Sequence, residues 1–458
     1  MFFSQYECVL EAIHNKWNIL LHGPGGCGKT YTIAKLINAL TIANPDAVIA
    51  CTALTGVAAA NLRGSIPVDA QTLHRWAGVQ LAHGPADQLV RKLYRNREAL
   101  DRWRTTDILF VDEISMLGKE LFEKFDYIAR SVRTMRKPFG GIQLVLSGDF
   151  LQLPPVDDEW VFTSRRWAEL DLVPYIFEDG VGKRYDDPAF FAMLLRARVG
   201  KLTADDARRL AARDQAYRDY LSEEEAQPGR AESVKPTLLF PTNRDADIHN
   251  SGKLAELDTP VRTYAAADVV NVHPRARQAT LDQLDKIIPA RIDLRVGAQV
   301  MLRANLDVAA GLTNGSRGVV VDLGPEWVLV RFLDGKEANI APHCWEHVER
   351  RRRRAKAAAD PEAKTADPSE TTASRSQIPL ILAWAFTIHK SQSCTINFAI
   401  VRLGSAIFAY GQAYVALSRV VNYNSLFLID FTVDSIFADE AAVAYARQLR
   451  EDTPVQYE

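Results

Sequence analysis

Apolar and polar positions in the first 170 or so residues follow two patterns. Four runs are short and almost entirely apolar, and two other stretches, at 9–17 and 31–40, space their apolar residues as a helix does. The apolar runs are residues 17–22, 47–52, 107–112 and 142–149. Such runs are typical of buried strands in a sheet with helices on both faces. The pattern predicts an α/β domain around a mostly parallel sheet.

The pattern changes in the rest of the chain. Residues 169–235 are charged and rich in Leu, Ala and Arg, which favours helices, whereas 237–243 reads as a strand that opens a second sheet. Residues 292–340 alternate with a period of two and are punctuated by Gly, which predicts a small β-barrel. Residues 349–376 have few apolar positions and are expected to form a mobile loop. From residue 379 the chain again reads as strand, helix and strand.

Length, composition and net charge exclude several classes of protein. A chain of 458 residues predicts two or three domains, and 47% apolar with 24% charged residues indicates a globular protein. No apolar run approaches the ~20 residues that span a bilayer, and the start lacks the features of a secretory or transit peptide. Five scattered cysteines favour a reducing compartment, so we expect an intracellular protein of the nucleus or cytoplasm without a structural metal. Because the net charge is -2, any nucleic-acid binding must come from local basic patches.

The strongest local motif is GPGGCGKT at residues 23–30, which matches the G-x-x-x-x-G-K-[ST] phosphate-binding loop in full. It follows an apolar strand and precedes a helix, so its backbone N–H groups can surround phosphates. Lys29 is expected to reach the β- and γ-phosphates of ATP, and Thr30 to bind Mg²⁺. The alternative is a Gly-rich turn that binds nothing.

Two further motifs end apolar strands. In VDEISML (111–117), Asp112 is expected to hold Mg²⁺ with Thr30, and Glu113 to act as general base toward the attacking water. A solvated strand end is the alternative for this pair. In SGDFLQLPPV (147–156), Gln152 is predicted to sense the γ-phosphate, although a plain exit from a strand would give the same residues.

The order of these and other motifs resembles the superfamily-1 DNA helicases of the petite-integration-frequency (PIF) family, close relatives of the RecD-like enzymes. The motifs extend over roughly residues 5–430. They are GPGGCGKT, CTALTGVAAANLRG, TLHRWAG, VDEISML, GDFLQLPPV, FPTN, GAQVML with NGSRG, WAFTIHKSQ and YVALSR.

The resemblance implies further residues of the nucleotide site. Arg184 and Arg419 correspond to arginines that enter the cleft from the second lobe, although the family commonly has Gln where this chain has Tyr185; for both arginines the alternative is a surface or structural role. Gln5 corresponds to an adenine-reading glutamine, and Gln412 begins the last motif. The expected ATP-binding set is Gln5, Gly23, Pro24, Gly25, Gly26, Cys27, Gly28, Lys29, Thr30, Tyr31 and Gln412, and the expected catalytic set is Lys29, Asp112, Glu113, Gln152, Arg184 and Arg419.

Three stretches resemble the surface that tracks a DNA strand: Leu54–Ala58 with Asn61, Thr72–Trp76, and Thr387–Gln392. Their hydroxyl groups and backbone N–H groups suit phosphates, and their rings suit stacking on bases, although a Trp is more often core. Ser393 replaces the glycine that usually follows TIHKSQ. The predicted DNA contacts are Thr55, Gly56, His74, Trp76, Thr387, His389, Lys390 and Ser391.

Two charged segments leave alternatives open. The Arg350–Arg354 run is either a solvated loop or a basic arm for DNA or a nuclear address. His343, Cys344 and His347 have a spacing that could hold a metal, but no second pair of ligands lies nearby in the sequence and the family has no such site.

The resemblance implies two RecA-like P-loop NTPase domains with a small SH3-like β insertion in the second. The expected boundaries are 1–168 for the first domain, 169–258 and 379–458 for the two parts of the second, and 259–378 for the insertion, with residues 77–104 as a short element that splits duplex DNA. The implied function is ATP-dependent DNA unwinding by movement from 5′ to 3′ on single-stranded DNA. Forked DNA is a further expected partner and Mg²⁺ the expected cofactor. The sequence leaves the oligomeric state open, with a monomer as the expectation.

Two other functions remain open from the sequence: a DNA-stimulated ATPase that remodels protein–DNA complexes without unwinding, and a non-catalytic DNA-binding relic. The relic is disfavoured because every phosphate-handling residue is present. Repair, replication, recombination and telomere maintenance are all compatible pathways, and the sequence does not select among them.

Overall fold

The computed structural model describes residues 2–63, 65–79, 82, 84–177, 184–226, 235–271, 274–304, 306–307, 310, 312, 314–347, 373–392, 394–396 and 398–453. The chain forms two compact units. The first comprises Met1–Glu223, Thr237–Asn243 and Phe386–Glu458, and the second comprises Glu224–Pro236 and Arg244–Ala385. The first unit contains two parallel sheets and the second is mainly antiparallel, so each is described separately below.

The first sheet of the first unit has six strands in the order β3-β2-β4-β5-β1-β6, and every neighbouring pair is parallel. The strands are β1 (Ile19–His22), β2 (Ile49–Ala53), β3 (Ala70–Thr72), β4 (Ile108–Asp112), β5 (Gln143–Gly148) and β6 (Val173–Ile176). Helix α1 (Phe2–His14) precedes the first strand, and the helices between the strands are α2 (Lys29–Ala43), α3 (Gly56–Arg63), α4 (Leu73–Ala77), α5 (Ala86–Leu93), α6 (Arg97–Thr105), α7 (Lys119–Arg133) and α8 (Arg165–Ala168). Short 3₁₀ turns occur at Ile114–Met116, Pro138–Gly141 and Val161–Thr163.

The four apolar runs therefore form β1, β2, β4 and β5, as predicted, because a strand covered on both faces is apolar at nearly every position. The helical prediction for residues 169–235 is wrong at its start, where Val173–Ile176 forms β6. This strand pairs only with β1, so it lies at the edge of the sheet and tolerates Pro174. The first sheet thus continues beyond the expected domain boundary at residue 168.

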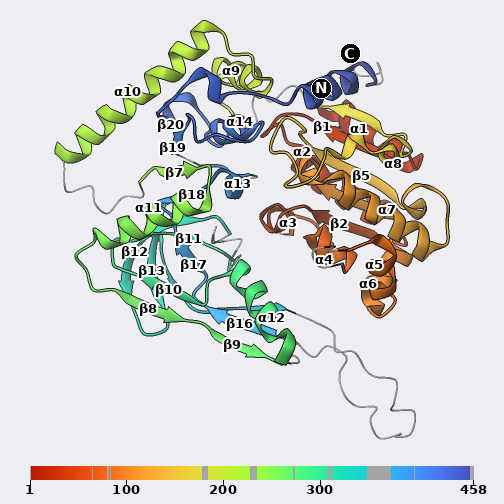
Figure 1. Ribbon diagram of the computed structural model, residues 1–458, viewed down its shortest axis with the longest axis horizontal. Helices are drawn as coiled ribbons and strands as arrows, with labels where there is room; N and C mark the ends of the chain where they lie inside the picture. The colour runs from red at the N-terminus through yellow and green to blue at the C-terminus, as the bar shows by residue number, and fades with distance from the viewer. Residues whose placement is uncertain are drawn as a thin grey trace, which may run out of the picture. The chain divides into compact units, whose positions relative to one another are not determined.

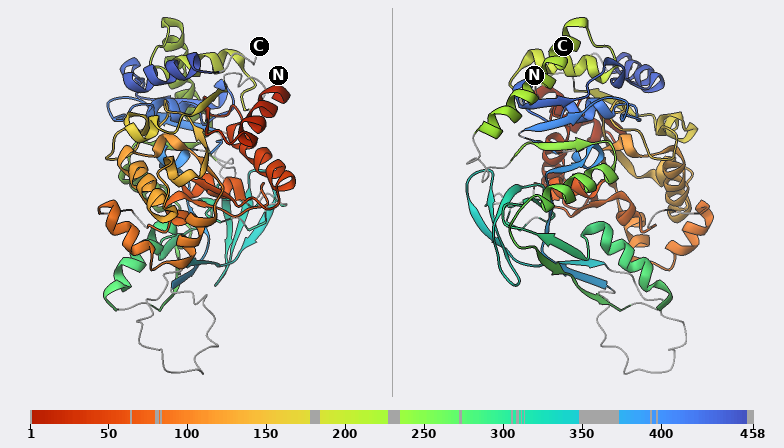
Figure 2. Two further views of the ribbon diagram at one scale, coloured as in Figure 1. Left: turned by 90° about the vertical axis from the view of Figure 1, so that its right-hand side faces the viewer. Right: turned by 60° about the vertical axis from the view of Figure 1, so that its left-hand side comes forward.

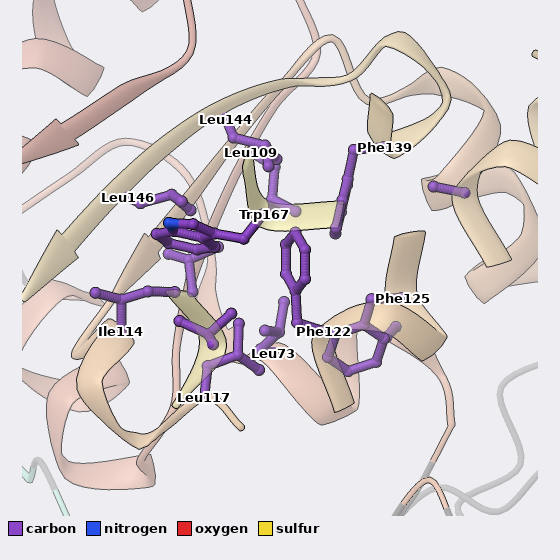
Figure 3. Close-up of a cluster of buried hydrophobic side chains, with 14 of the residues drawn as sticks. Leu73, Leu109, Ile114, Leu117, Phe122, Phe125, Phe139, Leu144, Leu146 and Trp167 are labelled. Carbon is purple, nitrogen blue, oxygen red and sulfur yellow. The ribbon is translucent and has the colours of Figure 1, made fainter. Parts of the chain in front are cut away.

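Apolar clusters cover the two faces of this sheet. One contains side chains of α1 and α2 together with Ile19 and Phe110. The other contains aromatic residues of α6 and α7 and also Ala442, Ala446 and Leu449 from the C-terminal helix. The left view in Figure 2 shows the red N-terminal helices and the blue C-terminal helix on opposite sides of the sheet. Figure 3 shows how Phe122 and Trp167 meet edge to face, with ring centroids 5.4 Å apart.

The second sheet of the first unit has the order β18-β7-β19-β20, and β19 is parallel to both of its neighbours (Figure 1). Its strands are β7 (Thr237–Phe240), β18 (Ala385–Thr387), β19 (Ala399–Arg402) and β20 (Leu426–Ile429). Its helices are α9 (Pro188–Arg198), α10 (Ala204–Ala226), α13 (Ile388–Ser391) and α14 (Gln412–Leu417), with 3₁₀ turns at Tyr423–Ser425 and Val433–Ser435. The C-terminal helix that packs on the first sheet is α15 (Glu440–Glu451). The prediction that 237–243 opens a second sheet is confirmed by β7.

The second unit is built around a five-stranded antiparallel sheet in the order β14-β13-β12-β11-β17. Two smaller sheets, β15-β16-β9 and β10-β8, complete it. Its strands are β8 (Arg262–Ala265), β9 (Ala267–Val270), β10 (Arg291–Leu294), β11 (Gln299–Leu302), β12 (Arg317–Leu323), β13 (Val328–Phe332), β14 (Glu337–Ile340), β15 (His343–His347), β16 (Ala373–Gln377) and β17 (Leu380–Leu382), and its helices are α11 (Asn243–Ala255) and α12 (Pro274–Ile287). Residues 292–340 do form strands, but these belong to the five-stranded sheet and to the β10-β8 pair, so their closure into the predicted small β-barrel stays a prediction.

Three further predictions concern the loop at 349–376, a metal site and membrane-spanning segments. The Arg350–Arg354 run and most of the expected loop at 349–376 lie outside the described residues, but its end, Ala373–Gln377, is strand β16. His343 and Cys344 lie in a strand, and no group of three or more metal-binding side chains occurs among the residues that the structure describes. No helix in the described ranges is long and apolar enough to cross a membrane.

The segment expected to split duplex DNA consists largely of α5 and α6. Their apolar residues Leu89, Leu93 and Leu100 are buried in the cluster that also holds α7. Trp103 of α6 is fully buried, and its indole N–H donates to the carbonyl of Ala77 at 3.0 Å. This segment is therefore anchored by core packing, and its role in strand separation stays a prediction.

Replacing Trp103 with Ala should destabilise the first unit. Trp103 packs on Trp76, with ring centroids 4.5 Å apart, and the deletion would leave a cavity in the core. We expect a loss of about 3–5 kcal/mol in the free energy of unfolding, measured by denaturant titration. Trp17 is 50% exposed, and its replacement with Ala should cost less than about 1 kcal/mol. Equal losses in the two variants would contradict the assignment of Trp103 to the core.

Candidate nucleotide-binding and hydrolysis site

The phosphate-binding loop lies between β1 and α2. Gly26 and Gly28 have φ angles of 83° and 92°, in the left-handed region that favours glycine, and Lys29 begins α2. A loop of this kind directs successive backbone N–H groups toward one point, where the helix N-terminus adds its positive end. The loop is thus a preformed anion site, and the alternative of an ordinary Gly-rich turn is disfavoured.

Lys29 is buried beside this loop. Its Nζ donates to the carbonyl oxygens of Gly23 and Pro24, at 2.6 and 2.9 Å. A buried ammonium needs such acceptors, because its charge is costly in a medium of low dielectric constant. The side chain is therefore held within the loop, next to the N–H groups that would surround a phosphate.

Asp112 ends β4 with its carboxylate fully buried. Thr30 donates its hydroxyl to Oδ2 at 2.9 Å, while Ser147 and the backbone N–H of Glu113 donate to Oδ1 at 2.8 and 2.9 Å. Burial, followed by the charge of Glu113, raises the pKa of Asp112 to about 6. The hydroxyl and carboxylate oxygens that meet here are ligands that Mg²⁺ prefers, so the pair predicted from the sequence is brought together and fits that ion.

Glu113 follows with φ of 59°, a left-handed conformation that is rare outside glycine. Such strain persists only where the surroundings enforce it, and it is common at active sites. Gln392, from the segment after α13, donates its Nε2 to Oε2 of Glu113 at 3.0 Å. The sequence predicted Gln392 only as part of the strand-tracking surface and missed this contact, which joins residues 279 positions apart.

Arg419 brings a buried cation from the second sheet to the same place. It is 1% exposed, and its guanidinium donates to the carbonyl oxygen of Val415 at 2.7 Å and to the hydroxyl of Ser418 at 2.7 Å. Burial, and then the charge of Arg184, lowers its pKa. A Cβ at Gly25 would lie 3.2 Å from Nη2 of Arg419, so the arginine lies directly against the phosphate-binding loop.

Arg184 reaches the loop from another side. A Cβ at Gly26 would lie 2.9 Å from Cδ of Arg184, so glycine is needed there both for its φ angle and for this close approach. Both arginines expected from the second lobe thus lie at the loop, although residues 178–183, which precede Arg184, lie outside the described part of the chain.

Two tyrosines that the sequence analysis did not assign to the site contact the backbone N–H and the carbonyl oxygen of Gly25. The N–H of Gly25 donates to the hydroxyl of Tyr414 at 3.1 Å. The hydroxyl of Tyr185 lies 3.2 Å from the carbonyl oxygen of Gly25 and 3.1 Å from that of Ser418. Tyr185 was noted only as a departure from the family pattern, and Tyr414 lies within the YVALSR motif, which was the available signal.

Gln152 lines the same space and is supported by a buried ion pair. Arg198 donates to Asp149 through Nε at 2.9 Å and Nη2 at 2.7 Å. Burial alone would raise the pKa of Asp149, but the charge and hydrogen bonds of Arg198 outweigh it and the pKa is lowered. The loop that holds Gln152 is further fixed by Gly411, where a Cβ would lie 2.4 Å from the carbonyl oxygen of Gln152. Sequence reasoning missed Arg198, which has no motif of its own.

These residues enclose one cavity of about 600 Å³. Its walls come from both sheets of the first unit, so the predicted catalytic residues do converge. The lining consists of Gly25, Gly26, Gly28, Lys29, Thr30, Tyr31, Ala58, Asn61, Asp112, Glu113, Gln152, Arg184 and Arg419. Ala58 and Asn61 belong to a stretch that was expected to track DNA, and the structure instead places them at the cavity.

Two predicted nucleotide contacts are not among the lining residues. Gln412 is completely buried, and its side-chain oxygen accepts from the backbone N–H groups of Phe408 and Ala409, which gives it a structural role in this fold. The structure therefore does not support Gln412 as a contact of ATP. Gln5 lies in α1, but its side chain is outside the described part.

The predicted DNA contacts divide by exposure. Lys390 is exposed on α13, and His389 stacks on the exposed ring of Phe408. Trp76, by contrast, is 1% exposed and packed on Trp103, so its position does not support base stacking. His74 packs edge-on against Phe125, and burial lowers its pKa.

The hydroxyl residues and Gly56 have more local positions. The hydroxyl oxygen of Thr55 accepts from the N–H of Ala58, and that of Thr387 accepts from the N–H of Lys390, so both cap helices. Gly56 has open space where a Cβ would lie. Ser391 is buried and donates its hydroxyl to the carbonyl of Ile388, which supports the turn rather than offering a free donor. Ser393 lies outside the described residues.

Comparison with known proteins places this geometry in a family. A profile described as PIF1-like helicase matches residues 4–167, and one described as the 2B domain of DNA helicase Pif1 matches residues 283–323. The chain is 34% identical to the ATP-dependent DNA helicase PIF1 of Danio rerio and 33% identical to that of Homo sapiens, over 98% and 99% of its own length. It spans 64% and 65% of those two proteins.

Solved structures agree. The crystal structure of Pif1 helicase from Candida albicans has a TM-score of 0.78 and 31% identity, covering 97% of this chain and 98% of that one. A Bacteroides Pif1 in complex with ADP-AlF4 has a TM-score of 0.71 at 23% identity, which bears on the fold alone. These similarities confirm the predicted fold class of two RecA-like domains with a β insertion. Because the likeness to the Candida albicans protein extends over nearly the whole of both chains, this chain belongs to the PIF1-like helicase family.

Proposed function

We propose that this chain is an ATP-dependent DNA helicase that moves along single-stranded DNA, as the sequence analysis predicted. The observation that carries the proposal is the cavity of the first unit. Glu113 enters it from the first sheet and Arg419 from the second, and both lie at one phosphate-binding loop. A site shared by two sheets links hydrolysis to their relative motion. The names of the relatives, which are ATP-dependent DNA helicases, support the same function.

The loop would bind the triphosphate through its backbone N–H groups, with Lys29 at the β- and γ-phosphates. To reach them, its Nζ would exchange the carbonyls of Gly23 and Pro24 for phosphate oxygens, which are stronger acceptors because they are charged. Thr30 and Asp112 would hold Mg²⁺, an ion that neutralises charge on the β- and γ-phosphate oxygens. Tyr31, which is 60% exposed and lines the cavity, would contact the nucleoside.

Hydrolysis requires a water oxygen to attack the γ-phosphorus while the bond to the β–γ bridging oxygen breaks. Glu113 would take the proton of that water as general base. Arg419 and Arg184 would stabilise the negative charge that spreads over the transferred group, and Gln152 would report its presence. Because Arg419 is already desolvated, little solvent reorganisation would accompany this stabilisation.

Movement along DNA would follow from the same geometry. Thr55 and Gly56 lie at the start of α3 in the first sheet's half, and Thr387, His389 and Lys390 lie at the end of β18 and in α13 of the second sheet's half, so each sheet would carry one grip on a phosphate backbone. Alternating grips would advance the strand by about one nucleotide for each ATP. The family resemblance implies movement from 5′ to 3′ and action on forked DNA. Binding of this kind is strongly dependent on salt and weakly dependent on sequence.

A DNA-stimulated ATPase that remodels protein–DNA complexes is the second candidate, because the cavity and the grips would serve it equally well. The two functions differ only in whether a duplex is opened. The expected monomeric state and intracellular site stay predictions from the sequence.

Replacing Lys29 with Ala should lower ATP turnover by about 10²–10³-fold, because a charge contact made at the transferring phosphate is lost. Binding to single-stranded DNA should persist, since Lys29 is buried away from the predicted grips. Phosphate release measures the first property and fluorescence anisotropy the second. Lys336→Ala, which changes an exposed lysine of the second unit, should keep normal turnover and serves as control. Near-normal hydrolysis by the Lys29 variant would contradict the assignment of the loop.

A strand-displacement assay separates the two candidate functions. We expect release of the labelled strand from a duplex with a 5′ single-stranded tail, and little release from one with a 3′ tail, when ATP and Mg²⁺ are present. If single-stranded DNA raises turnover while neither substrate is opened, the remodelling ATPase is the correct function. Release from the 3′-tailed duplex alone would overturn the polarity.

Lys390→Ala should weaken binding to single-stranded DNA for all base sequences and reduce the slope of log affinity against log salt by about 0.7, the value for one phosphate contact on a single strand. Titration by anisotropy at several salt concentrations measures this slope. Trp76→Phe, which keeps an aromatic core residue, should leave DNA affinity unchanged, because the indole is not at the surface. A large loss of affinity in the Trp76 variant alone would restore that residue as a DNA contact.

A further inference from the structure

Gln392 lies at the junction between the predicted DNA grip and the predicted general base. It directly follows α13, whose residues include His389 and Lys390, and it is 2% exposed. Its Nε2 donates to Oε2 of Glu113 at 3.0 Å. The orientation of the base in the first sheet is therefore set in part by a side chain of the second.

The same short segment also holds the buried arginine of the site. Nη1 of Arg419 donates to the carbonyl oxygens of Ser391 and Cys394, at 3.3 and 3.5 Å. Gln392 lies between these two acceptors in the chain. A shift of residues 391–394 would thus move Glu113 and Arg419 together relative to the phosphate-binding loop.

The connection to the DNA grip is short and stiff. Thr387 caps α13 by accepting from the N–H of Lys390 at 3.3 Å, and Ser391 donates to the carbonyl of Ile388 at 2.7 Å. These bonds tie the backbone from residue 387 to residue 391 into one turn. A strand that engages Lys390 would therefore act on a turn whose next residue contacts Glu113.

The other end of the Gln392 amide indicates why a glutamine is present. Its Oε1 is buried without a hydrogen-bond partner among the residues that the structure describes. An unpaired buried acceptor costs about 1–3 kcal/mol, so an apolar side chain would serve better if packing were its only role. The hydrogen bond that Nε2 donates to Glu113 therefore explains why a glutamine is present despite this cost.

We propose that Gln392 is a positioning residue that aims the carboxylate of Glu113 from the second sheet and thereby makes ATP hydrolysis depend on the strand held at α13. The inference rests on the proposed function and adds to it the contact through which DNA and hydrolysis communicate. Strained backbone fixes the Cα of Glu113, and the hydrogen bond from Gln392 to Oε2 constrains the orientation of its carboxylate.

The test compares ATP turnover with and without a saturating oligothymidine in the full chain. Gln392→Met keeps the side-chain length and removes the donor, and Gln392→Glu keeps the shape but opposes Glu113 with a second carboxylate. We expect DNA-stimulated kcat to fall by about tenfold or more in both variants, because the base is no longer aimed. The KM for ATP and the Kd for the oligonucleotide should change by less than about twofold, and unstimulated turnover should fall much less than the stimulated rate.

The matched control is Gln215→Met, which deletes a glutamine that donates to Asp219 at 2.8 Å on the exposed surface of α10. It should retain wild-type stimulation, and melting curves should show all variants folded. Stimulated kcat within about twofold of wild type in both Gln392 variants would overturn the inference, as would an equal loss with and without DNA. If the unaltered protein hydrolyses no ATP in the presence of DNA, the proposed function itself fails, a result distinct from either outcome above.

Discussion

The site depends on a desolvated cation held against an anion-binding loop. Arg419 is buried, and its described partners are neutral acceptors: the carbonyls of Val415, Ser391 and Cys394 and the hydroxyl of Ser418. Such partners orient a guanidinium without cancelling its charge, and its lowered pKa reflects that environment. In a medium of low dielectric constant an unneutralised cation interacts strongly with an arriving phosphate. The second sheet must therefore meet the loop of the first for the site to exist.

Several surrounding residues hold the second sheet against the phosphate-binding loop of the first. Tyr414 and Tyr185 contact the N–H and the carbonyl oxygen of Gly25, and Gly411 allows the backbone after β19 to approach the carbonyl of Gln152. The pair of Asp149 and Arg198 adds a buried bridge with two charge-assisted bonds. Such a pair contributes little net stability, because desolvation offsets its attraction, but breaking it is costly. The role of this ion pair is to fix the position of the loop that carries Gln152.

Asp112 and Glu113 have different surroundings, which suit them to different chemical roles. Asp112 accepts three hydrogen bonds and is completely enclosed, which suits a metal ligand that does not move. Glu113, one residue later, turns into the left-handed region and projects into the cavity. Because the backbone conformation changes between these neighbours, Asp112 stays buried as the expected metal ligand, whereas Glu113 faces the cavity, where it can act on water. Gln392 then ties the second of these to the segment that is predicted to hold DNA.

Much of the fold was predictable because its signals are local. Apolar runs form β1, β2, β4 and β5, since a strand buried on both faces must be apolar throughout. The edge strand β6 was missed, because a strand paired on one side carries a weaker pattern. Asn61, Gln412 and Trp76 were assigned by motif position. The structure places Asn61 at the cavity, Gln412 in a buried hydrogen bond to the backbone of Phe408, and Trp76 in the core.

The sequence by itself determined the phosphate-binding loop and the carboxylate pair, because a loop between a strand and a helix, and the end of an apolar strand, are specified by adjacent residues. Only the tertiary structure decided the contacts of Gln392 with Glu113 and of Tyr414 with Gly25, which join residues 279 and 389 positions apart. No local pattern encodes such pairs, because they arise from the packing of two sheets whose strands are far apart in the chain.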